Sequence, residues 1–593
     1  MRKPFCNLIS LFLSIKRDQD SVMNFWDEIY GCVNYLNLPY DTVMNLPVYV
    51  RKFWIKKHNR QVEEEQAEIV EEEMKTKIPV FVEDEIKKIN DNPDSEDFNF
   101  LLEGDNLHSL HLLEKTHLGK IDVIYIDPPY NTGNKDFKYN DDFVDSENTF
   151  RHSKWLSFME RRLRIAQKLL SPNGIIFISI DNKEGYQLKL LLDEIFGEEQ
   201  MAADLHVETS AVAGPRRFAA VNGSVVKTAE FIFVYTNGNK AIMKRPMYDG
   251  ISGFDTHYSL FEDPESGILT PLVNEINKNE TLVAQFTNAG LKVNMPSLNK
   301  LVQVNPVIKE WLYQENISKH IFRLGDAIKL TDDEISQLTP NAVTYLNGKY
   351  ITLNGKGKPT VLFRYFDRLG LSDDYTPEYG ERTIRGNLWK GFSADGGNLA
   401  SEGGVKFKNG KKPKRLIKQL IKSCTVPSSQ NVIILDFFAG SGTTGQAVME
   451  LNYEGAGNYQ FILATNDEVV ETTYQRMENV SSDFPMNLKY FKTDFVVKEE
   501  FPDVSLEYEL LKYVTPLVEL EFGIDITNPK VQIVLNDEQL ESLVENNQLI
   551  SNSTIFMHPD VFRDAEQNQV LLDLKIKVQE IPNYFFGTEL WSK

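Results

Sequence analysis

The chain has 593 residues, of which 41% are hydrophobic and 25% charged, and this length allows several domains with separate cores. Its three cysteines, Cys6, Cys32 and Cys424, are far apart and show no CxxC or Cys/His spacing, which argues against a disulfide framework and a metal site and favours the cytoplasm. The formal net charge of −22 counts against a simple nucleic-acid binder, but residues 405–422 carry eight cations and no acid.

The N-terminal part predicts a helical module followed by a linker. Residues 1–60 are rich in aromatic and apolar side chains, and their role is open. The apolar run near the start is closed by Lys16 and Arg17 at about half of the ~20 residues that a membrane span needs, and no signal-peptide cleavage site follows. We therefore expect a buried helix there and no membrane association. Residues 61–77 are acidic and predict a solvated linker.

Residues 78–206 alternate between apolar strands and amphipathic helices. The strand 121–126 ends at Asp127, the residues 150–170 have helical periodicity, and 174–180 form a second apolar strand. This order predicts a parallel sheet that is covered by helices on both faces.

The alternation stops in residues 207–395, which contain many Asn, Gly and Pro, and resumes in residues 396–482. There we expect a basic helix at 413–424 and strands at 432–436 and 459–464. The sequence thus predicts one α/β domain that is split by a long insertion and followed by a C-terminal domain at 483–593.

A glycine-rich turn follows the strand that ends at Asp436. Gly440, Gly442 and Gly445 spell GxGxxG, and Asp467 and Glu468 lie about 20 residues further on, as a ribose-binding acid would. Such a turn suits an adenosine-type cofactor, NAD or S-adenosylmethionine, without separating the two. The alternative is a tight strand–helix turn without a ligand.

A second motif, Asp127-Pro128-Pro129-Tyr130, stands at the carboxyl end of a strand, where open α/β sheets bind ligands. Two prolines stiffen the loop between a carboxylate and an aromatic ring. The motif suits a planar ring with an exocyclic amine, because the carboxylate and a proline carbonyl accept the amine hydrogens and Tyr130 stacks on the ring. The alternative is a strand-ending turn with an exposed tyrosine.

Together, the two motifs resemble the DNA amino-methyltransferases, and their order with a long insertion between them resembles the beta class. The text EGDNLHSLHLLEKTHLGKIDVIYIDPPYNTGNKDFKYNDDF is similar to the modification (Mod) subunit of type III restriction-modification systems. The likeness covers about 78–205 and 380–500, is diffuse in the insertion, weak beyond 500 and absent before about 75.

The resemblance implies a Rossmann-like S-adenosylmethionine-dependent methyltransferase acting on adenine N6 in double-stranded DNA. Asp127 and the Pro128 carbonyl would hold the amine, with Pro129 in the motif and Tyr130 on the base. The residues implied for the cofactor are Asp105, Lys412, Pro413, Asp436, Phe438, Gly440, Ser441, Gly442, Thr443, Asp467 and Glu468. Asn131 to Phe143 would close over a flipped base.

The resemblance further implies a homodimer and a separate helicase-nuclease subunit as a possible partner. Specificity is expected in the insertion, where Arg216, Arg217, Arg382, Arg385 and Lys390 are available for DNA. The stretch 405–422 is expected either to face DNA or to flank the cofactor.

Several alternatives are weighed against this interpretation. A dehydrogenase leaves Asp-Pro-Pro-Tyr unexplained. A protein or RNA methyltransferase fits less well with the long insertion, and Ser in place of Asp127 would have favoured cytosine N4. A non-enzymatic target-recognition subunit is compatible with the methyltransferase role.

Overall fold

The computed structural model describes residues 76–585, with gaps at 94, 96, 132–150, 214, 239–243, 398, 408–409, 427–430 and 502–503. The expected helical module at 1–60, nearly all of the linker 61–77 and the closing loop beyond Asn131 lie outside the described residues. The chain divides into two compact units, and the second comprises Arg245–Ala394.

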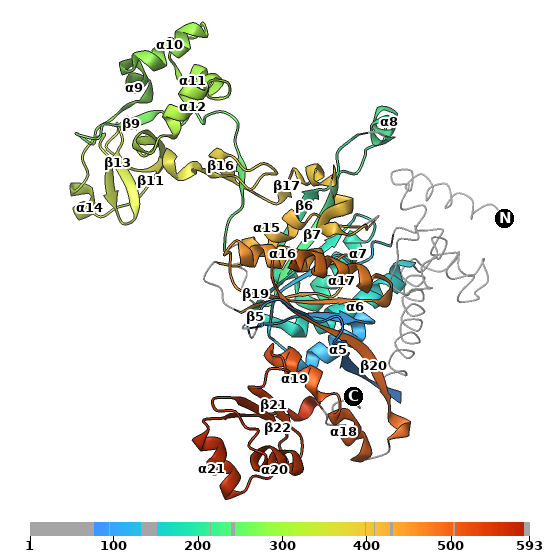
Figure 1. Cartoon of the computed structure of the whole chain (residues 1–593). Coiled ribbons are helices and arrows are strands. Elements are labelled where there is room, and N and C mark those ends of the chain that lie inside the picture. The colour runs from blue at the N-terminus through green and yellow to red at the C-terminus, as the bar shows by residue number, and fades with distance from the viewer. Residues whose placement is uncertain are drawn as a thin grey trace, which may run out of the picture. The chain divides into compact units, whose positions relative to one another are not determined.

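The first unit is built on one sheet, with the strand order β1-β20-β3-β19-β18-β4-β5-β7-β6 and β2 beside β20 (Figure 1). The six strands from β20 to β5 are parallel, whereas β1, β7 and β6 are antiparallel to their neighbours. The strand bounds are β1 Lys77–Glu83, β2 Ile89–Asn90, β3 Asn99–Glu103, β4 Ile121–Ile126, β5 Leu170–Ile180, β6 Met201–Glu208, β7 Ala229–Thr236, β18 Val432–Asp436, β19 Tyr459–Thr465 and β20 Asn487–Val497.

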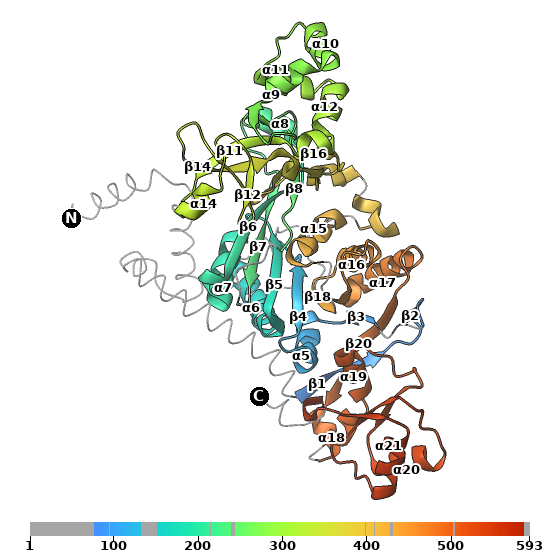
Figure 2. The same ribbon diagram turned by 90° about the vertical axis from the view of Figure 1, so that its left-hand side faces the viewer.

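Helices cover both faces of this sheet, which confirms the expected α/β architecture. In Figures 1 and 2, α5 (Asn106–Thr116), α6 (Arg151–Leu169) and α7 (Gly185–Phe196) lie on one face. The other face carries α15 (Lys414–Cys424), α16 (Thr443–Tyr453) and α17 (Asp467–Ser481). The α6 helix packs on the sheet through one apolar face. This face consists of residues at helical spacing that are all buried: Trp155, Met159, Leu163 and Ala166.

The direction of the connections changes between two neighbouring strands. From β4 the chain passes through α6 to β5 on one side, whereas from β18 it passes through α16 to β19 on the other side. The strands β4 and β18 pair directly, at Val123↔Ile434 and Ile124↔Leu435. Their carboxyl ends therefore meet at a topological switch point, where open α/β sheets bind ligands.

The hairpin β6–β7 belongs to the sheet and not to the second unit. Its residues Phe231 to Thr236 pair with β5, and Ile232, Val234 and Tyr235 are buried. The compact second unit consequently begins at Arg245, some way beyond the expected boundary at 207, because this apolar strand is more strongly held by the sheet than its polar flanks suggest.

The second unit has its own sheets and core. One sheet has the order β10-β9-β11-β14-β13-β12 and another β15-β16-β8, and Phe286, Leu298, Ile308 and Tyr365 are among its buried residues. Its elements are β8 Tyr248–Gly250, β9 Leu260–Glu262, β10 Leu269–Pro271, α9 Leu272–Lys278, α10 Glu280–Asn288, α11 Met295–Val302, α12 Pro306–Tyr313, α13 Glu315–Ser318, β11 Ile321–Ala327, α14 Asp332–Ser336, β12 Thr344–Leu346, β13 Lys349–Leu353, β14 Pro359–Arg364, β15 Leu369–Leu371, β16 Tyr379–Ile384 and β17 Leu388–Trp389.

The C-terminal part begins inside the central sheet, since β20 lies between β1 and β3. The buried Lys489 of β20 forms ion pairs with Glu83 at 2.9 Å and Asp525 at 3.0 Å, and also pairs with Glu519. A small parallel sheet β21-β22-β23 with its own core follows. Its elements, with the helices before and between its strands, are α18 Val504–Leu511, α19 Val514–Phe522, β21 Val531–Val534, α20 Asp537–Glu545, β22 Thr554–Met557, α21 Ala565–Asp573 and β23 Lys577–Glu580. Within the described residues, no helix combines the length and the apolar character that crossing a membrane requires.

Candidate active site

Lys412 brings the Asp-Pro-Pro-Tyr motif together with a strand far away in the sequence. Its Nζ lies 3.0 Å from Asp127 Oδ1 and 3.2 Å from Glu230 Oε2. The same ammonium donates to the Tyr130 hydroxyl at 2.6 Å and stands 4.6 Å from the centre of its ring. Tyr130 in turn donates to Glu230 at 3.2 Å. One cation thus holds two carboxylates and one phenol together.

The charges in this cluster are mutually dependent. Burial raises the pKa of Asp127 and the nearby Glu230 adds to this effect, while the Lys412 ammonium opposes it. Burial likewise disfavours the charged form of Glu230, yet the cations of Lys412 and Lys227 hold its pKa below the usual value. For Lys412, the two carboxylates outweigh burial and raise its pKa, so the amine stays protonated.

The proline carbonyls of the motif have different environments. The buried Trp155 of α6 donates from its Nε1 to the Pro129 carbonyl at 2.7 Å. Among the described residues, no hydrogen bond reaches the carbonyl of the buried Pro128. The loop then turns at Asn131, which has a φ of 52° and donates to the buried Glu184. One carbonyl is therefore used to fix the loop, and the other is left to accept a hydrogen bond from a ligand.

The glycine-rich turn begins at Asp436, whose carboxylate is buried at the end of β18. It accepts hydrogen bonds from the Phe438 amide at 3.0 Å and from the Thr444 hydroxyl. Burial raises the pKa of Asp436 to about 7, and these two donors only partly offset that effect. Gly440 and Gly442 have φ values of 51° and 75°, which favour glycine, and so the turn brings its backbone close to the strand ends.

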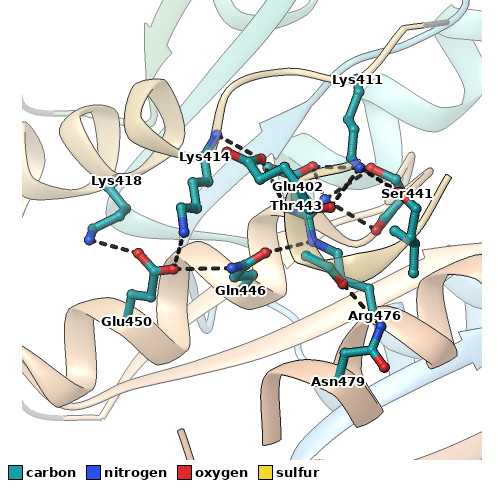
Figure 3. A network of polar contacts seen from close by, with 12 residues as sticks. Glu402, Lys411, Lys414, Lys418, Ser441, Thr443, Gln446, Glu450, Arg476 and Asn479 are labelled. Atoms are coloured by element: carbon teal, nitrogen blue, oxygen red, sulfur yellow. Dashed lines mark hydrogen bonds and ion pairs between the residues drawn. The ribbon is translucent and has the colours of Figure 1, made fainter. Parts of the chain in front are cut away.

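The buried Arg476 holds the glycine-rich turn through hydrogen bonds (Figure 3). Arg476 of α17 is fully buried and donates to Thr443 Oγ1 at 2.7 Å and to Ser441 Oγ at 3.2 Å. It also donates to Gln446 Oε1 at 2.8 Å and pairs with Glu402 at 3.0 Å. The hydroxyls of Ser441 and Thr443 thus accept hydrogen bonds from Arg476, and their expected role at the cofactor stays a prediction.

Asp105 is tied to the same turn through α5. Its side chain caps the helix by accepting from the Leu107 amide at 2.7 Å, and it pairs with Arg162 at 3.0 Å. The neighbouring Asn106 donates to the Phe437 carbonyl at 2.6 Å. Three parallel strands, β3, β18 and β4, thus place Asp105, Asp436 and Asp127 along one edge of the sheet.

The sequence-predicted residues are brought together to different degrees. Lys412, Asp127 and Tyr130 are in contact, and Pro413 precedes α15 as its N-cap. The buried Phe438 stands 6.0 Å from the ring of Phe158. The side chains of Asp467 and Glu468 lie outside the described residues, so their expected role stays a prediction.

Four residues of the site were missed from the sequence: Trp155, Arg162, Glu230 and Arg476. Only Glu230 has a local signal, since it is a single acid at the start of the apolar strand Phe231 to Tyr235. The other three are ordinary members of amphipathic helices, and their contacts join elements that are distant in the chain.

Several cations of the basic stretch 405–422 pair with acidic side chains. On α15, Lys414 and Lys418 pair with Glu450 of α16 at 2.6 and 2.9 Å (Figure 3). Lys422 pairs with Glu454 at 2.9 Å. The expectation that it flanks the cofactor site fits Lys412, whereas these three cations are already neutralised.

The cations considered for DNA contact differ in their exposure to solvent. Arg385 is buried and pairs with Asp249 at 2.6 Å, and the Arg382 guanidinium lies 3.8 Å from the ring centre of Tyr248. Arg216, Arg217 and Lys390 are exposed. In the described part of the chain, no three His, Cys, Asp or Glu side chains are grouped as a metal site would need.

Comparison with known proteins adds a family to this geometry. Residues 121–470, more than half of the chain, match the family model described as DNA methylase. The chain is 31% identical over 398 residues to a probable type III restriction-modification enzyme HindVI Mod subunit of Haemophilus influenzae, covering 63% of this chain and 50% of the relative. It is 30% identical to the EcoPI Mod subunit of Escherichia phage P1, covering 63% and 58%. The chain thus spans between one half and three fifths of the length of these relatives.

Among solved structures, a putative DNA modification methylase of Thermus thermophilus in complex with S-adenosyl-L-methionine aligns over 66% of this chain and 97% of its own, with a TM-score of 0.29 and 11% identity.

Proposed function

The chain belongs to the DNA methylase family, and from this premise we propose that it transfers a methyl group from S-adenosylmethionine to the N6 amine of adenine in double-stranded DNA. We further propose the role of a type III modification subunit, in line with the names of its relatives. A homodimer, a helicase-nuclease partner and a cytoplasmic location stay predictions.

The observation that carries the proposal is the pair of acceptors at the end of β4. The Asp127 carboxylate and the Pro128 carbonyl, which lacks a hydrogen-bond donor among the described residues, can accept both hydrogens of an exocyclic amine. This draws the nitrogen lone pair out of conjugation with the ring and makes it nucleophilic. Tyr130 supplies a flat face beside them. Because these groups lie within the sheet edge, the target base has to leave the duplex to reach them.

The cofactor would lie along the neighbouring strand end. S-adenosylmethionine, when bound, supplies an activated methyl group. The positive φ angles of Gly440 and Gly442 let the backbone approach such a ligand, and the buried Asp436 offers a carboxylate to its cationic part. Lys412 holds Asp127 until the base arrives, and Glu230 and Tyr130 provide the alternative partners for its ammonium.

The test is expression of the full chain in a host without DNA methylation, followed by single-molecule sequencing and mass analysis of the nucleosides. We expect N6-methyladenine within one sequence motif. Asp127→Ala should abolish methylation and leave binding of S-adenosylmethionine within about threefold of wild type. N4-methylcytosine, or no modified base, would contradict the proposal.

A further inference from the structure

A long projection of the first unit has no place in the chemistry described so far. Residues 209–228, the hairpin tip, connect β6 to β7 and contain α8 (Pro215–Val221), which stands away from the sheet in Figure 1. The tip is closed at its base, where the amides of Thr209 and Ser210 donate to the Thr228 carbonyl at 3.1 and 3.2 Å. Among the described residues, none of those from Arg216 to Val225 is buried.

The hairpin tip exposes apolar side chains. Phe218 is 72% exposed, Val221 76% and Val225 fully. Phe218 and Val221 are three residues apart on α8, and therefore project from one side of the helix. Large apolar groups grouped in this way on a projection mark a surface that is covered by a partner.

The positive charge of the hairpin tip indicates that its partner is DNA. The tip contains Arg216, Arg217 and Lys227 and no acid, although the chain as a whole has 86 acidic and 64 basic residues. Arg216 and Arg217 are exposed, whereas Lys227 pairs with Asp181 at 3.2 Å near the base of the hairpin. Apolar wedge residues flanked by arginines are the combination that proteins use to enter a base stack while holding the adjacent phosphates.

The position of the hairpin tip agrees with this partner. The strand that leaves it, β7, carries Glu230 as its second residue, and Glu230 contacts both Tyr130 and Lys412. The hairpin tip is therefore attached next to the candidate site. A duplex whose flipped base enters this site lies close enough to contact the tip.

We propose that the hairpin tip enters the DNA duplex beside the target adenine, with Phe218 and Val221 filling the space that the flipped base leaves and Arg216 and Arg217 on the flanking phosphates. This inference rests on the proposed function. It assigns to the tip the stabilisation of the flipped state, separate from the methyl transfer at Asp127.

The experiment uses the full chain and a 30-base-pair duplex that contains the mapped motif with 2-aminopurine at the target position, whose fluorescence rises when the base is unstacked. For Phe218→Ala we expect the fluorescence rise to fall at least fivefold and single-turnover methylation of the matching adenine duplex to fall at least tenfold. Binding of S-adenosylmethionine should stay within twofold, and Phe218→Leu should restore most of both signals. Phe562→Ala is the matched control, since Phe562 is 73% exposed on the C-terminal part.

The phosphate contacts are tested by the salt dependence of duplex binding, measured by fluorescence anisotropy. The double variant Arg216→Gln/Arg217→Gln should reduce the slope of log Kd against log salt by about 2, because each phosphate contact contributes roughly 0.9. Arg563→Gln, at another exposed arginine beside a phenylalanine, should leave the slope unchanged.

The outcomes separate the two proposals. A wild-type chain that neither binds nor methylates duplex DNA overturns the proposed function and the wedge together. An active wild type with Phe218→Ala equal to it in flipping and rate overturns the wedge alone. A change in molar mass of Phe218→Ala by light scattering, with flipping unchanged, would also overturn it and would assign the tip to a second copy of the chain.

Discussion

Asp127 and Glu230 share one ammonium group, that of Lys412, although they stand on strands that are about 100 residues apart in the chain. The sharing matters because, in the proposed function, Asp127 accepts hydrogens from an incoming amine while a cation is bound to it. Glu230 and the Tyr130 hydroxyl offer this cation a second position, so the Asp127 carboxylate can be released without leaving the ammonium unpaired.

Replacement of Glu230 by Gln should therefore slow the chemistry and spare the cofactor. Asp127 would then be the one carboxylate that pairs with Lys412, and we expect the single-turnover rate of methyl transfer to fall roughly 10-fold to 100-fold. The dissociation constant of S-adenosylmethionine should change less than threefold. Rapid-quench kinetics measures the rate, and Glu541→Gln on the exposed side of α20 is the control. An unchanged rate would remove Glu230 from the mechanism.

Gly442→Ala should weaken cofactor binding more than its backbone angle alone predicts. The φ of 75° is strained for alanine, and the added Cβ would stand 3.2 Å from Met477 Cε and from Thr473 Cγ2. The control is Gly455→Ala, which has a φ of 66° and no atom within 4 Å of the new Cβ. We expect Gly455→Ala to cost about 1 kcal/mol of stability. Calorimetry should show a loss of cofactor affinity of tenfold or more for Gly442→Ala only.

Cofactor binding should depend on pH through Asp436. Burial raises the pKa of its carboxyl to about 7, so below pH 7 the free folded protein holds a proton there that the unfolded chain has lost above about pH 4. The free energy of unfolding from this group thus decreases as the pH rises from 4 to 7. A cationic ligand favours the carboxylate, and binding between pH 5.5 and 7 should release a proton and tighten as the pH rises.

Calorimetry in two buffers of different ionisation enthalpy measures this proton release. Asp436→Asn should abolish both the release and the dependence of affinity on pH in this range. Equal proton release by wild type and variant would show that another group titrates.

The pair Arg476–Glu402 should contribute to stability and to the shape of the glycine turn at once. Arg476→Met leaves the half-buried Glu402 carboxylate without its cation and removes two donors from Ser441 and Thr443, so we expect a loss of about 3 kcal/mol and weaker cofactor binding. The double variant with Glu402→Gln should lose less than the sum of the two single changes. Urea unfolding measures the free energies of unfolding of the single and double variants.

The control for this prediction is Arg164→Met. Arg164 pairs with Glu160 and Glu194 at the surface, where such pairs contribute about 1 kcal/mol or less. A similar loss for Arg164→Met and Arg476→Met, or strict additivity of the double variant, would contradict the role assigned to the Arg476–Glu402 pair.

The sequence could predict those parts of the site that are properties of single strand ends. Asp127 and Asp436 each follow an apolar run directly, and the rule that carboxyl ends of parallel strands carry ligands places both at one edge. Trp155 and Arg476 could not be predicted in their roles, because a helix periodicity shows that a residue is buried but not which carbonyl or hydroxyl it will meet. The contact of Trp155 with Pro129 exists only once α6 has docked on the sheet.

The boundary of the insertion likewise depends on strand pairing, which the local sequence pattern does not show. The flanks of β7 are rich in polar and small residues, and they suggest that the α/β pattern has already ended. Pairing with β5 along six residues overrides them, from Ile175↔Thr236 to Ile180↔Phe231. The polar content of 405–422 was similarly ambiguous, since the acids that neutralise its lysines stand on α16.

The chain leaves the first unit after Lys244, beyond β7, and returns to it at Asp395, ahead of α15. At the first of these points, the register of β7 is set by its pairing with β5. Neither the pairing of β4 with β18 nor the position of Lys412 depends on the length of what is inserted between them. The inserted unit is for this reason exchangeable: recombination at these two points, or a graft made by an engineer, can replace it while the residues of the candidate site stay as they are.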